Sequence, residues 1–345
     1  MKIRTICWAR NESDILETFV RHHAQFSDVF IVLHRCIDNS EEILSLLAAE
    51  GLPVRWRNDV RLMHEQSVVM SELMREAFRD GVDWVLPLDA DEFLHGNVTM
   101  MLEAQGTDPR VIRTPWRGYV PTPNDTVSEQ NVLKRITHRR NQEFPRWYKM
   151  MIPKTADANA ELCFGNHALI DANGKQMSHT NTPLVVAHFP IRSERQVMRK
   201  VFGGWLSYTA DPTHAHGGCF QWKELYEKMK NGLNLQPAEL TQLAMDYATE
   251  KQWYKLPETF AQGPIPGYDL EERPSGEAII IPDPIPSNFT VKYHIKDAEP
   301  IRVLLETAED IALAHANILR KNLSSFADAS SEASGESVVV NEKNL

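Results

Sequence analysis

The feature of this chain that most constrains its fold is a regular alternation of apolar and helix-like segments before residue 95. Short apolar runs predict strands at 2–8, 29–33, 54–56 and 84–88. Between them, acidic and amide residues at 11–14 and 38–42 suit helix starts, and 64–80 carries a broad apolar face. Strands that alternate with helices in this way predict a parallel sheet covered by helices.

Polar side chains follow these predicted strands at their carboxyl ends. Arg10 and Asn11 follow the first strand, Asp38 comes after the second, and Asp89 and Asp91 come after the fourth. Ligands of parallel α/β sheets bind beyond the carboxyl ends of the strands. We therefore expect these side chains to meet in one binding site.

After residue 100 the pattern changes to shorter segments. We predict strands at 111–116, 132–138, 147–152 and 184–189. We predict helices at 193–200, 221–255 and 300–321. Between them we expect a loop at 208–218 and an arm rich in Pro and Gly at 264–286. The chain would then divide into a main α/β domain over 1–215, with halves 1–95 and 96–215, a mainly helical extension with the Pro-rich arm over 216–322, and a disordered tail over 323–345.

Charge and cysteine content narrow the class of function. The net charge of −10 argues against a general nucleic-acid-binding protein. The four cysteines form no Cys-x-x-Cys pair, so we expect neither a structural zinc site nor a disulfide framework. No apolar run approaches the ~20 residues of a membrane span. We expect a cytoplasmic protein and leave open a peripheral association with the inner face of the membrane.

Two carboxylates stand at the end of the fourth predicted strand, in the sequence LDADEF of residues 88–93. Residues i and i+2 of a strand share a face, so Asp89 and Asp91 can both reach one ligand. Mg²⁺ and Mn²⁺ take oxygen ligands and commonly combine one or two carboxylates with substrate phosphates. Such an ion would neutralise the diphosphate that leaves a nucleotide sugar. The alternative is a loop whose acids only cap the next turn.

These segments together resemble family-two-like glycosyltransferases, which have the GT-A fold. The resemblance rests on RNE at 10–12 with DILE at 14–17 and His23, DNS at 38–40, Gln66, DADEFL at 89–94, and HFP at 188–190 with Arg192, Ser193 and Lys200. It is good over 1–95, patchy over 110–205 and absent after about 215. It implies a GT-A-like, Rossmann-type, mostly parallel sheet flanked by helices, here with a helical C-terminal extension, in which 1–95 binds the nucleotide and 96–215 the acceptor.

The resemblance also implies roles for single residues. The base and ribose of the donor would be bound by residues after the first two strands, namely Ala9, Arg10, Glu12 and Asp38. Gln66 would contact the donor, Asp89 would lie near the ribose or the metal, Asp91 would bind the metal, and His188 would be a second metal ligand. The sequence departs from the family at Cys36 and Ile37, where a more acidic or Gly-containing turn is usual.

Further side chains are candidates for phosphate binding and catalysis. Arg192, Arg195 and Arg199 share a helix face, which either grips the diphosphate through Arg192 or is merely solvated. An inverting transferase also needs a general base for the acceptor hydroxyl. The candidates are Glu92, Glu194, Asp211 and His167. The sequence selects none of them, and we name Glu194 and His167 as the predicted catalytic residues. Trp116, Tyr119, Trp147, Trp205 and Tyr208 are candidates for stacking on an acceptor sugar.

The favoured function is transfer of a sugar from a UDP- or GDP-type donor, with Mn²⁺ or Mg²⁺, to a glycan, lipid-linked or protein acceptor. A nucleotidyltransferase would usually have a Gly-rich loop after the first strand, and ARNE at 9–12 lacks glycine. A haloacid-dehalogenase-type phosphatase carries its Asp-x-Asp after the first strand rather than the fourth. A zinc site made by His214, His216 and Cys219 is disfavoured. A non-catalytic carbohydrate-binding or scaffold protein derived from a transferase remains the alternative of a different class.

Overall fold

The structure is a computed structural model that describes residues 1–106, 109–212, 220–231, 235–249, 269–273, 308–309 and 311–323. The chain divides into two compact units. The first unit comprises Met1–Val60, Glu65–Val197 and Leu235–His294, and the second comprises Arg61–His64, Met198–Asn234 and Ile295–Leu345.

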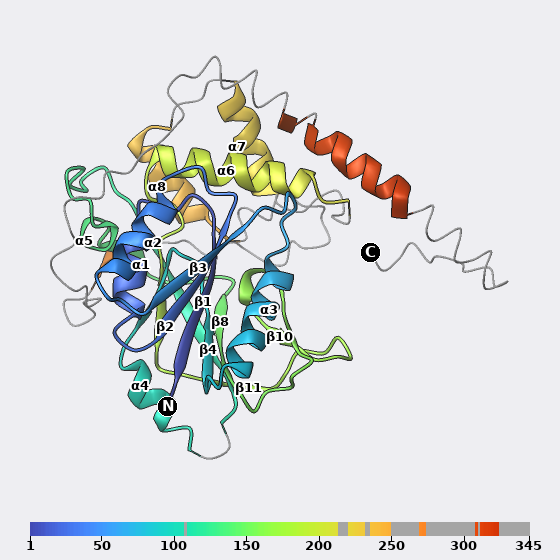
Figure 1. Cartoon of the computed structure of the whole chain (residues 1–345). Coiled ribbons are helices and arrows are strands. Elements are labelled where there is room, and N and C mark those ends of the chain that lie inside the picture. Colours follow the sequence, from blue (N-terminus) through green and yellow to red (C-terminus); the bar gives the residue numbers. More distant parts are fainter. Residues whose placement is uncertain are drawn as a thin grey trace. The chain divides into compact units, whose positions relative to one another are not determined.

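The first unit is built on a sheet whose first half is parallel (Figure 1). Its four strands, β1 (Ile3–Ala9), β2 (Asp28–His34), β3 (Val54–Asp59) and β4 (Trp84–Pro87), lie in the order β3-β2-β1-β4. β1 and β2 are buried along almost their whole length. A strand buried on both faces needs apolar side chains on both, which is why these strands are rich in continuous apolar residues. The predicted parallel arrangement is confirmed here.

Helices cover both faces of this parallel half. α1 (Leu16–His23) and α2 (Ser40–Ala49) pack on one face, and α3 (Gln66–Arg79) packs on the other (Figure 1). Phe19 of α1 belongs to one apolar cluster, and Leu73 of α3 belongs to a separate cluster across the sheet. The two clusters are the two cores that a sheet covered on both faces requires.

The first helix begins later than the signal at 11–14 predicts. α1 starts at Leu16, and Asn11 adopts a positive φ of 55°. The side-chain oxygen of Asn11 accepts a hydrogen bond from the backbone nitrogen of Ile37 at 2.8 Å. Asn11 therefore joins the loops that follow β1 and β2, and does not cap the helix.

The second half of the sheet is mixed. Its strands are β5 (Glu92–His95), β6 (Val111–Val120), β7 (His138–Arg140), β8 (Tyr148–Pro153), β11 (His179–Asn181) and β12 (Val185–His188). β4 pairs with β8 antiparallel, β8 pairs with β6 antiparallel, and β12 lies parallel to β6 and antiparallel to β5. The result is a mixed α/β sheet flanked by helices, which confirms the predicted Rossmann-type, GT-A-like class. Smaller elements complete this region: α4 (Val98–Glu103), β9 (Glu161–Leu162), the 3-10 turn Phe164–Asn166, and β10 (Leu169–Ile170).

The strand predicted at 132–138 is wrong. The chain forms a short helix there, α5 (Val132–Arg135), before β7 begins. The side-chain oxygen of Asn131 accepts a hydrogen bond from the backbone nitrogen of Leu133 at 3.0 Å, which starts the helical turn. Val132 and Ile136 are buried one turn apart, so the apolar residues follow a helical spacing rather than the alternation of a strand.

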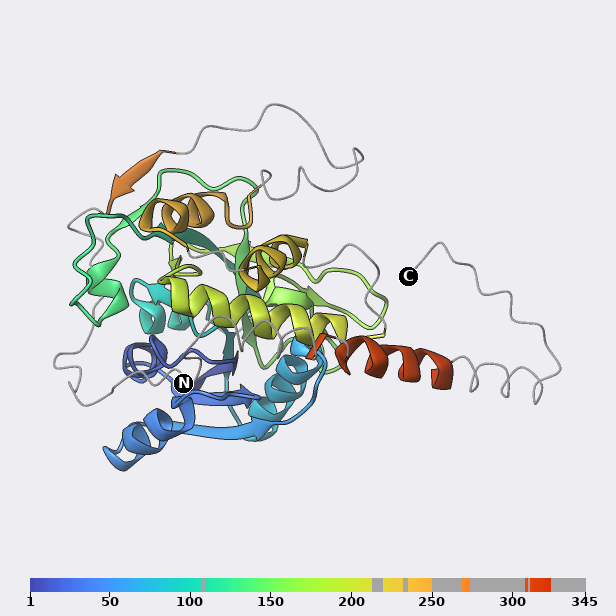
Figure 2. The ribbon, with the colours of Figure 1, turned by 90° about the horizontal axis from the view of Figure 1, so that it is seen from above.

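Two segments beyond residue 215, where we placed the end of the main domain, belong to the first unit. α8 (Pro237–Asp246) packs on β6, and the hydroxyl of Thr241 donates to the carbonyl oxygen of Pro121 at 2.8 Å. β13 (Leu270–Glu272), the orange arrow in Figure 2, pairs antiparallel with β7. Parts of the predicted extension thus complete the sheet unit.

In the part of the second unit that the structure describes, the regular elements are helices. It contains most of α6 (Glu194–Thr209), all of α7 (Phe220–Lys230) and helical residues at 311–323. The Lys230 ammonium lies 2.9 Å from the carboxylate of Glu309, and the indole nitrogen of Trp205 donates to the same carboxylate at 3.4 Å. The helical character that we predicted for the extension is confirmed in α7 and in the helical residues from 311 onward.

Several predictions concern residues outside the described ranges. These are most of the Pro-rich arm, the tail from residue 324, and the three zinc candidates His214, His216 and Cys219. Along the ranges that are described, no helix is both long enough and apolar enough to cross a membrane.

Candidate functional site

The loops at the carboxyl ends of β1 and β4 meet where the strand order reverses. The chain runs outward from β1 through β2 to β3, and then returns to place β4 on the other side of β1. Ligands of open α/β sheets bind in the crevice at such a reversal. Ala9 ends β1, Arg10 follows it, and Asp89 lies just beyond β4, so these predicted site residues share this edge.

The acidic segment turns directly from β4 into β5. The backbone nitrogen of Glu92 donates to the carbonyl of Asp89 at 3.0 Å, and the nitrogen of Asp89 donates to the Glu92 carboxyl at 2.9 Å, which closes the turn. The Asp89 side chain is 29% exposed, whereas those of Asp91 and Glu92 are 2% and 0% exposed. Of these three carboxyl groups, Asp89 therefore faces outward and the other two are held inside.

A buried lysine on β8 neutralises this segment, and the sequence analysis missed it. Lys149 Nζ lies 2.7 Å from Asp89 Oδ2 and 3.1 Å from Glu92 Oε1, and it donates to the carbonyl of Gly165 at 2.7 Å. Only 1% of its side chain is exposed. The one signal in the sequence was a lone charged residue inside the otherwise apolar strand at 147–152.

The protonation of this cluster follows from burial. Burial raises the pKa of Glu92 to about 8, although the charge of Lys149 opposes that rise. Burial would lower the pKa of Lys149, but Asp89 and Glu92 outweigh it and raise that pKa above its usual value. Burial thus disfavours the charged form of Glu92, whereas the two carboxyl groups favour the ammonium form of Lys149.

Gln66, which we predicted to contact the donor, is bonded to the acidic segment. It is the first residue of α3, and its side-chain nitrogen donates to Asp89 Oδ1 at 2.8 Å. Its side-chain oxygen accepts a hydrogen bond from the backbone nitrogen of Gly165 at 3.1 Å. Gln66 and Lys149 together tie Asp89 to the turn at Gly165.

Arg192, which we predicted to grip a diphosphate, is engaged inside the protein. Its guanidinium, which has no exposed surface, bonds to the carboxylates of Glu12 and Asp14 and donates to the carbonyl of Phe189 at 2.9 Å. It also lies 3.6 Å from Asp91 Oδ2. Burial would lower the pKa of Arg192, but Asp14 and Glu12 outweigh it and raise the pKa well above its usual value. The role of this arginine is to join the β1 loop to the segment after β12.

We expect Arg192→Lys to destabilise the fold by about 2–3 kcal/mol. Lysine keeps the charge but cannot make the forked bonds to Asp14 and Glu12, so it leaves part of a buried ion-pair network unmade. Urea unfolding monitored by circular dichroism measures the change. Arg192 precedes α6 and so, contrary to our prediction, does not share a helix face with Arg195. The control is Arg195→Lys, at an exposed position in the first turn of α6, for which a change within about 0.5 kcal/mol is expected. Equal losses in the two variants would contradict this role.

His188, the predicted second metal ligand, lies beside Asp91. His188 Nε2 is 3.6 Å from Asp91 Oδ1, which is too long for a hydrogen bond. The ring stacks on Trp116 with 4.3 Å between centroids and an angle of 17°, and meets Tyr247 edge-on at 5.6 Å. The two rings and the pairing of β12 with β5 hold His188 next to the acidic segment.

In their chemistry, the residues present fit a divalent cation that takes only part of its ligands from the protein, because a carboxylate and an imidazole lie next to each other. Two adjacent ligands about 2.1 Å from an octahedral ion stand about 3.0 Å apart. Asp91 Oδ1 and His188 Nε2, which are 3.6 Å apart, would therefore have to move slightly closer together to bind one ion. No group of three or more His, Cys, Asp or Glu side chains in the described ranges could hold a metal. An ion here would complete its shell with water and substrate phosphate, as Mg²⁺ and Mn²⁺ commonly do.

The loops after β1 and β2 contain the other predicted donor residues and brace one another. Asp38 accepts hydrogen bonds from the backbone nitrogens of Ser13 at 3.0 Å and Ser40 at 3.1 Å. Ala9 is buried in the core with its carbonyl facing Cys36 Sγ at 3.7 Å. Burial lowers the pKa of Arg10 to about 10, and the neighbouring charge of Arg35 adds to that effect. The two loops are therefore hydrogen-bonded into one edge, which carries the arginines Arg10 and Arg35 as well as carboxylates.

His167, a predicted catalytic residue, lies on the same side of the site as Lys149. Its Nδ1 lies 2.9 Å from the carbonyl oxygen of Tyr148, which can only accept, so Nδ1 carries the hydrogen and Nε2 presents a lone pair. The ring packs against Trp147 at 4.8 Å and Trp116 at 5.4 Å. Burial, with help from the charge of Lys149, lowers the pKa of His167 to about 4, so the ring is neutral at pH 7.

The lowered pKa of His167 predicts that the folded protein loses stability in acid. The unfolded chain binds a proton at His167 below about pH 6.5, while the folded chain resists it until about pH 4. Stability from this group is therefore complete above pH 6.5 and is lost as the pH falls toward 4. We expect the thermal midpoint to fall between pH 7.5 and 5, and the fall to be shallower in His167→Gln. An unchanged slope in His167→Gln would contradict the assignment.

Glu194, the other predicted catalytic residue, has a different contact. Its carboxylate accepts a hydrogen bond from the backbone nitrogen of Leu235 at 2.9 Å. Within the described part of the chain it forms no hydrogen bond to the acidic segment or to His188. Glu194 thus ties the start of α6 to the segment just before α8.

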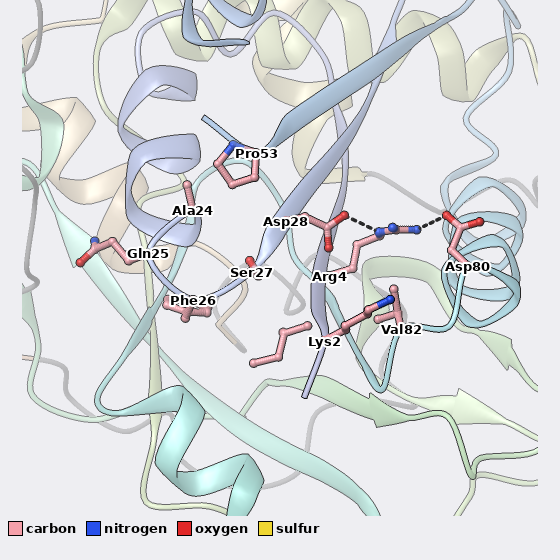
Figure 3. A pocket seen from close by; sticks show the side chains of 11 residues that line it. Lys2, Arg4, Ala24, Gln25, Phe26, Ser27, Asp28, Pro53, Asp80 and Val82 are labelled. Carbon is pink, nitrogen blue, oxygen red and sulfur yellow. Dashed lines mark hydrogen bonds and ion pairs between the residues drawn. The ribbon is translucent and has the colours of Figure 1, made fainter. Parts of the chain in front are cut away.

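A pocket of about 520 Å³ lies at the opposite edge of the sheet, at the amino ends of the strands (Figure 3). Three of its charged side chains are already paired with one another, because Arg4 bonds to Asp28 at 2.7 Å and to Asp80 at 2.6 Å. None of the predicted site residues lines it. The candidate site is therefore the edge that carries the acidic segment.

No protein-family model and no curated protein matches the chain. Three solved structures resemble parts of it. The mannosyltransferase PcManGT from Pyrobaculum calidifontis, in complex with GDP-Man and Mn²⁺, is 15% identical over 33% of this chain and 35% of that chain, with a TM-score of 0.26. Mannose-1-phosphate geranyltransferase from Thermus thermophilus is 16% identical over 45% of this chain and 51% of that chain, with a TM-score of 0.25. S. aureus TarS is 9% identical over 75% of this chain and 46% of that chain, with a TM-score of 0.34. This chain thus spans between 35% and 51% of the length of these proteins.

Proposed function

We propose that the protein is a metal-dependent glycosyltransferase that moves a sugar from a nucleoside-diphosphate sugar to a glycan, lipid or protein acceptor. One observation carries the proposal: an acidic segment at the strand-order reversal, with Asp89 facing outward and Asp91 beside His188. Oxygen and imidazole ligands at this edge suit a divalent ion that also binds phosphate. The sequence resemblance of 1–95 to family-two-like glycosyltransferases supports the same function.

The donor would lie between the loops after β1, β2 and β4. Asp91 and His188 would hold Mn²⁺ or Mg²⁺, and Asp89 would face the ribose or the ion. The bound ion would supply positive charge to the leaving diphosphate. Arg10, which follows β1 at this edge, would be the basic side chain that faces the diphosphate, because Arg192 is engaged by Glu12 and Asp14. Glu12 and Asp38 would then shape the nucleotide pocket by bracing its loops.

The acceptor hydroxyl would approach His167. The Nε2 lone pair can accept its hydrogen bond, since Nδ1 donates to Tyr148. A histidine whose pKa lies near 4 is a weak base at pH 7, so this ring orients the hydroxyl and does not retain its proton. Glu194 is less suited to the role of base, because its carboxylate is occupied by the Leu235 amide.

Calorimetric titration with UDP, GDP, CDP and ADP, each with and without Mn²⁺, tests the donor site. We expect one diphosphate to bind with an affinity that rises about tenfold or more when the ion is present, since the ion bridges the protein and the phosphates. The matching nucleotide sugar should then be hydrolysed slowly or transferred in the presence of a suitable acceptor.

The other outcomes select other functions. Binding of nucleoside triphosphates with release of pyrophosphate would indicate a nucleotidyltransferase. Binding of glycans with no diphosphate bound under any condition would indicate a carbohydrate-binding protein derived from a transferase. Either result would overturn the glycosyltransferase proposal.

A further inference from the structure

A segment from late in the chain returns to the site and is fixed there. The guanidinium of Arg140 donates to the carbonyl oxygens of Tyr247 at 2.8 Å and Met245 at 3.3 Å. The indole nitrogen of Trp147 donates to the carbonyl of Ala248 at 2.8 Å. These bonds attach the residues that follow α8 to β7 and to the start of β8.

Arg140, which makes two of these bonds, is buried in a closely fitting environment. Arg140 is 2% exposed, and its guanidinium is paired with Glu143, which is 5% exposed. Gly118 of β6 lies directly beside the guanidinium, and a Cβ at this position would come within 2.5 Å of Arg140 Nη2. A buried, paired arginine that needs a glycine beside it holds the backbone of Tyr247 in one place.

Tyr247 completes a group of rings around the acidic segment. Its ring lies 5.6 Å from that of His188, and His167 lies 4.8 Å from Trp147. Trp116 lies behind the two histidines and is only 5% exposed. Trp147, His167 and Tyr247 are only partly buried. These three rings, here called the ring wall, are the ones that keep accessible surface beside the site.

The ring wall is joined to the outward-facing carboxylate. Lys149 donates to Asp89 at 2.7 Å and to the carbonyl of Gly165 at 2.7 Å, and Gly165 lies two residues before His167. Aromatic surface and hydrogen-bonding groups therefore stand side by side: a carboxylate, an imidazole nitrogen and a phenol. The C–H face of a sugar ring packs on aromatic rings while its hydroxyls bond to polar groups around them.

We infer that Trp147, His167 and Tyr247 form the binding surface for an acceptor sugar, so that the acceptor of this enzyme is a carbohydrate. The inference rests on the proposed glycosyltransferase function and deepens it. A lipid chain would need a continuous apolar groove, and here polar atoms lie between the rings. Tyr247 is a substrate-positioning residue that comes from beyond the part of the chain that resembles a known family.

Saturation-transfer NMR with the methyl glycosides of glucose, galactose, mannose and N-acetylglucosamine tests the inference, in the presence of the diamagnetic ion Mg²⁺ and the diphosphate that binds best. We expect at least one glycoside to receive saturation from the wild-type protein. Tyr247→Ala should weaken its binding by about fivefold or more, the scale of losing one stacked ring. Tyr247→Phe should keep most of it. The control is Tyr148→Ala, which removes a half-buried ring under Arg113 on the other face of the sheet.

The outcomes separate this inference from the proposed function. If the diphosphate binds but no glycoside does, or if Tyr247→Ala and Tyr148→Ala lower glycoside binding equally, the ring wall is not a sugar site. A lipid or peptide acceptor would then account for the transferase. If no diphosphate binds in the first place, the proposed function itself fails. Diphosphate affinity that is unchanged in Tyr247→Ala shows that the variant is folded and that its defect lies on the acceptor side.

Discussion

Asp91→Asn is expected to lower glycosyl transfer by about 10³-fold and to remove the dependence of diphosphate binding on Mn²⁺. The change keeps the shape of the side chain but removes the charge that would face an ion between Asp91 and His188, which are 3.6 Å apart. The fold should survive, because Arg192 keeps its bonds to Glu12 and Asp14. Calorimetry with and without Mn²⁺, together with turnover of the nucleotide sugar, measures both effects.

Asp83→Asn is the matched control for this prediction. Asp83 lies just before β4, at the opposite end of the strand from the acidic segment, and binds Lys154 and the backbone nitrogen of Lys2. The Asp83→Asn substitution should leave activity within about twofold of wild type, as is usual for a surface carboxylate away from the site. If Asp91→Asn retained metal-dependent binding of the diphosphate, the ion would lie elsewhere and the proposed donor site would be wrong.

Lys149→Met is expected to destabilise the protein by about 3 kcal/mol. The side chain is 1% exposed, and its loss leaves Asp89 without its cation and the Gly165 carbonyl without its donor. Methionine fills nearly the same space, so the loss reports charge and hydrogen bonding rather than a cavity. Urea unfolding at pH 7 provides the measurement.

Two further variants test whether the loss comes from the buried pairing of Lys149. Lys154→Met removes an ammonium that also pairs with an aspartate, Asp83, but its side chain is 58% exposed, so a loss below about 1 kcal/mol is expected. The double variant Lys149→Met/Asp89→Asn should recover at least about 1 kcal/mol, because residue 89 then carries no charge that has lost its partner. If the double variant were as unstable as the sum of the two single variants, Lys149 would not act through Asp89.

The parts of this protein that the sequence predicted are those set by local pattern. β1 and β2 are recognisable because strands covered on both faces are apolar along their length. The acidic segment is recognisable because its place follows from the end of β4 alone. Where local signals compete, the prediction was wrong, as at 132–138, where the Asn131 cap turned an apolar run into a helix.

The assembly of the site depends on contacts between residues far apart in sequence. Lys149 is 60 residues from Asp89, and Arg192 is 180 residues from Glu12. Lys149 faces the acidic segment only because of the register in which β8 pairs with β6, and a shift by one residue would turn it to the other face. No periodicity along the chain specifies that register.

The sequence by itself therefore determined the parallel half of the sheet, the carboxyl edge where we propose that a ligand binds, and the identity of the acidic groups on it. The tertiary structure alone decided which of these groups faces outward, that Arg192 is buried and ion-paired inside the protein, and that Tyr247 lies beside His188. The physical reason is that burial and pairing belong to the packed unit. A side chain's charge and exposure depend on neighbours that only the fold brings together.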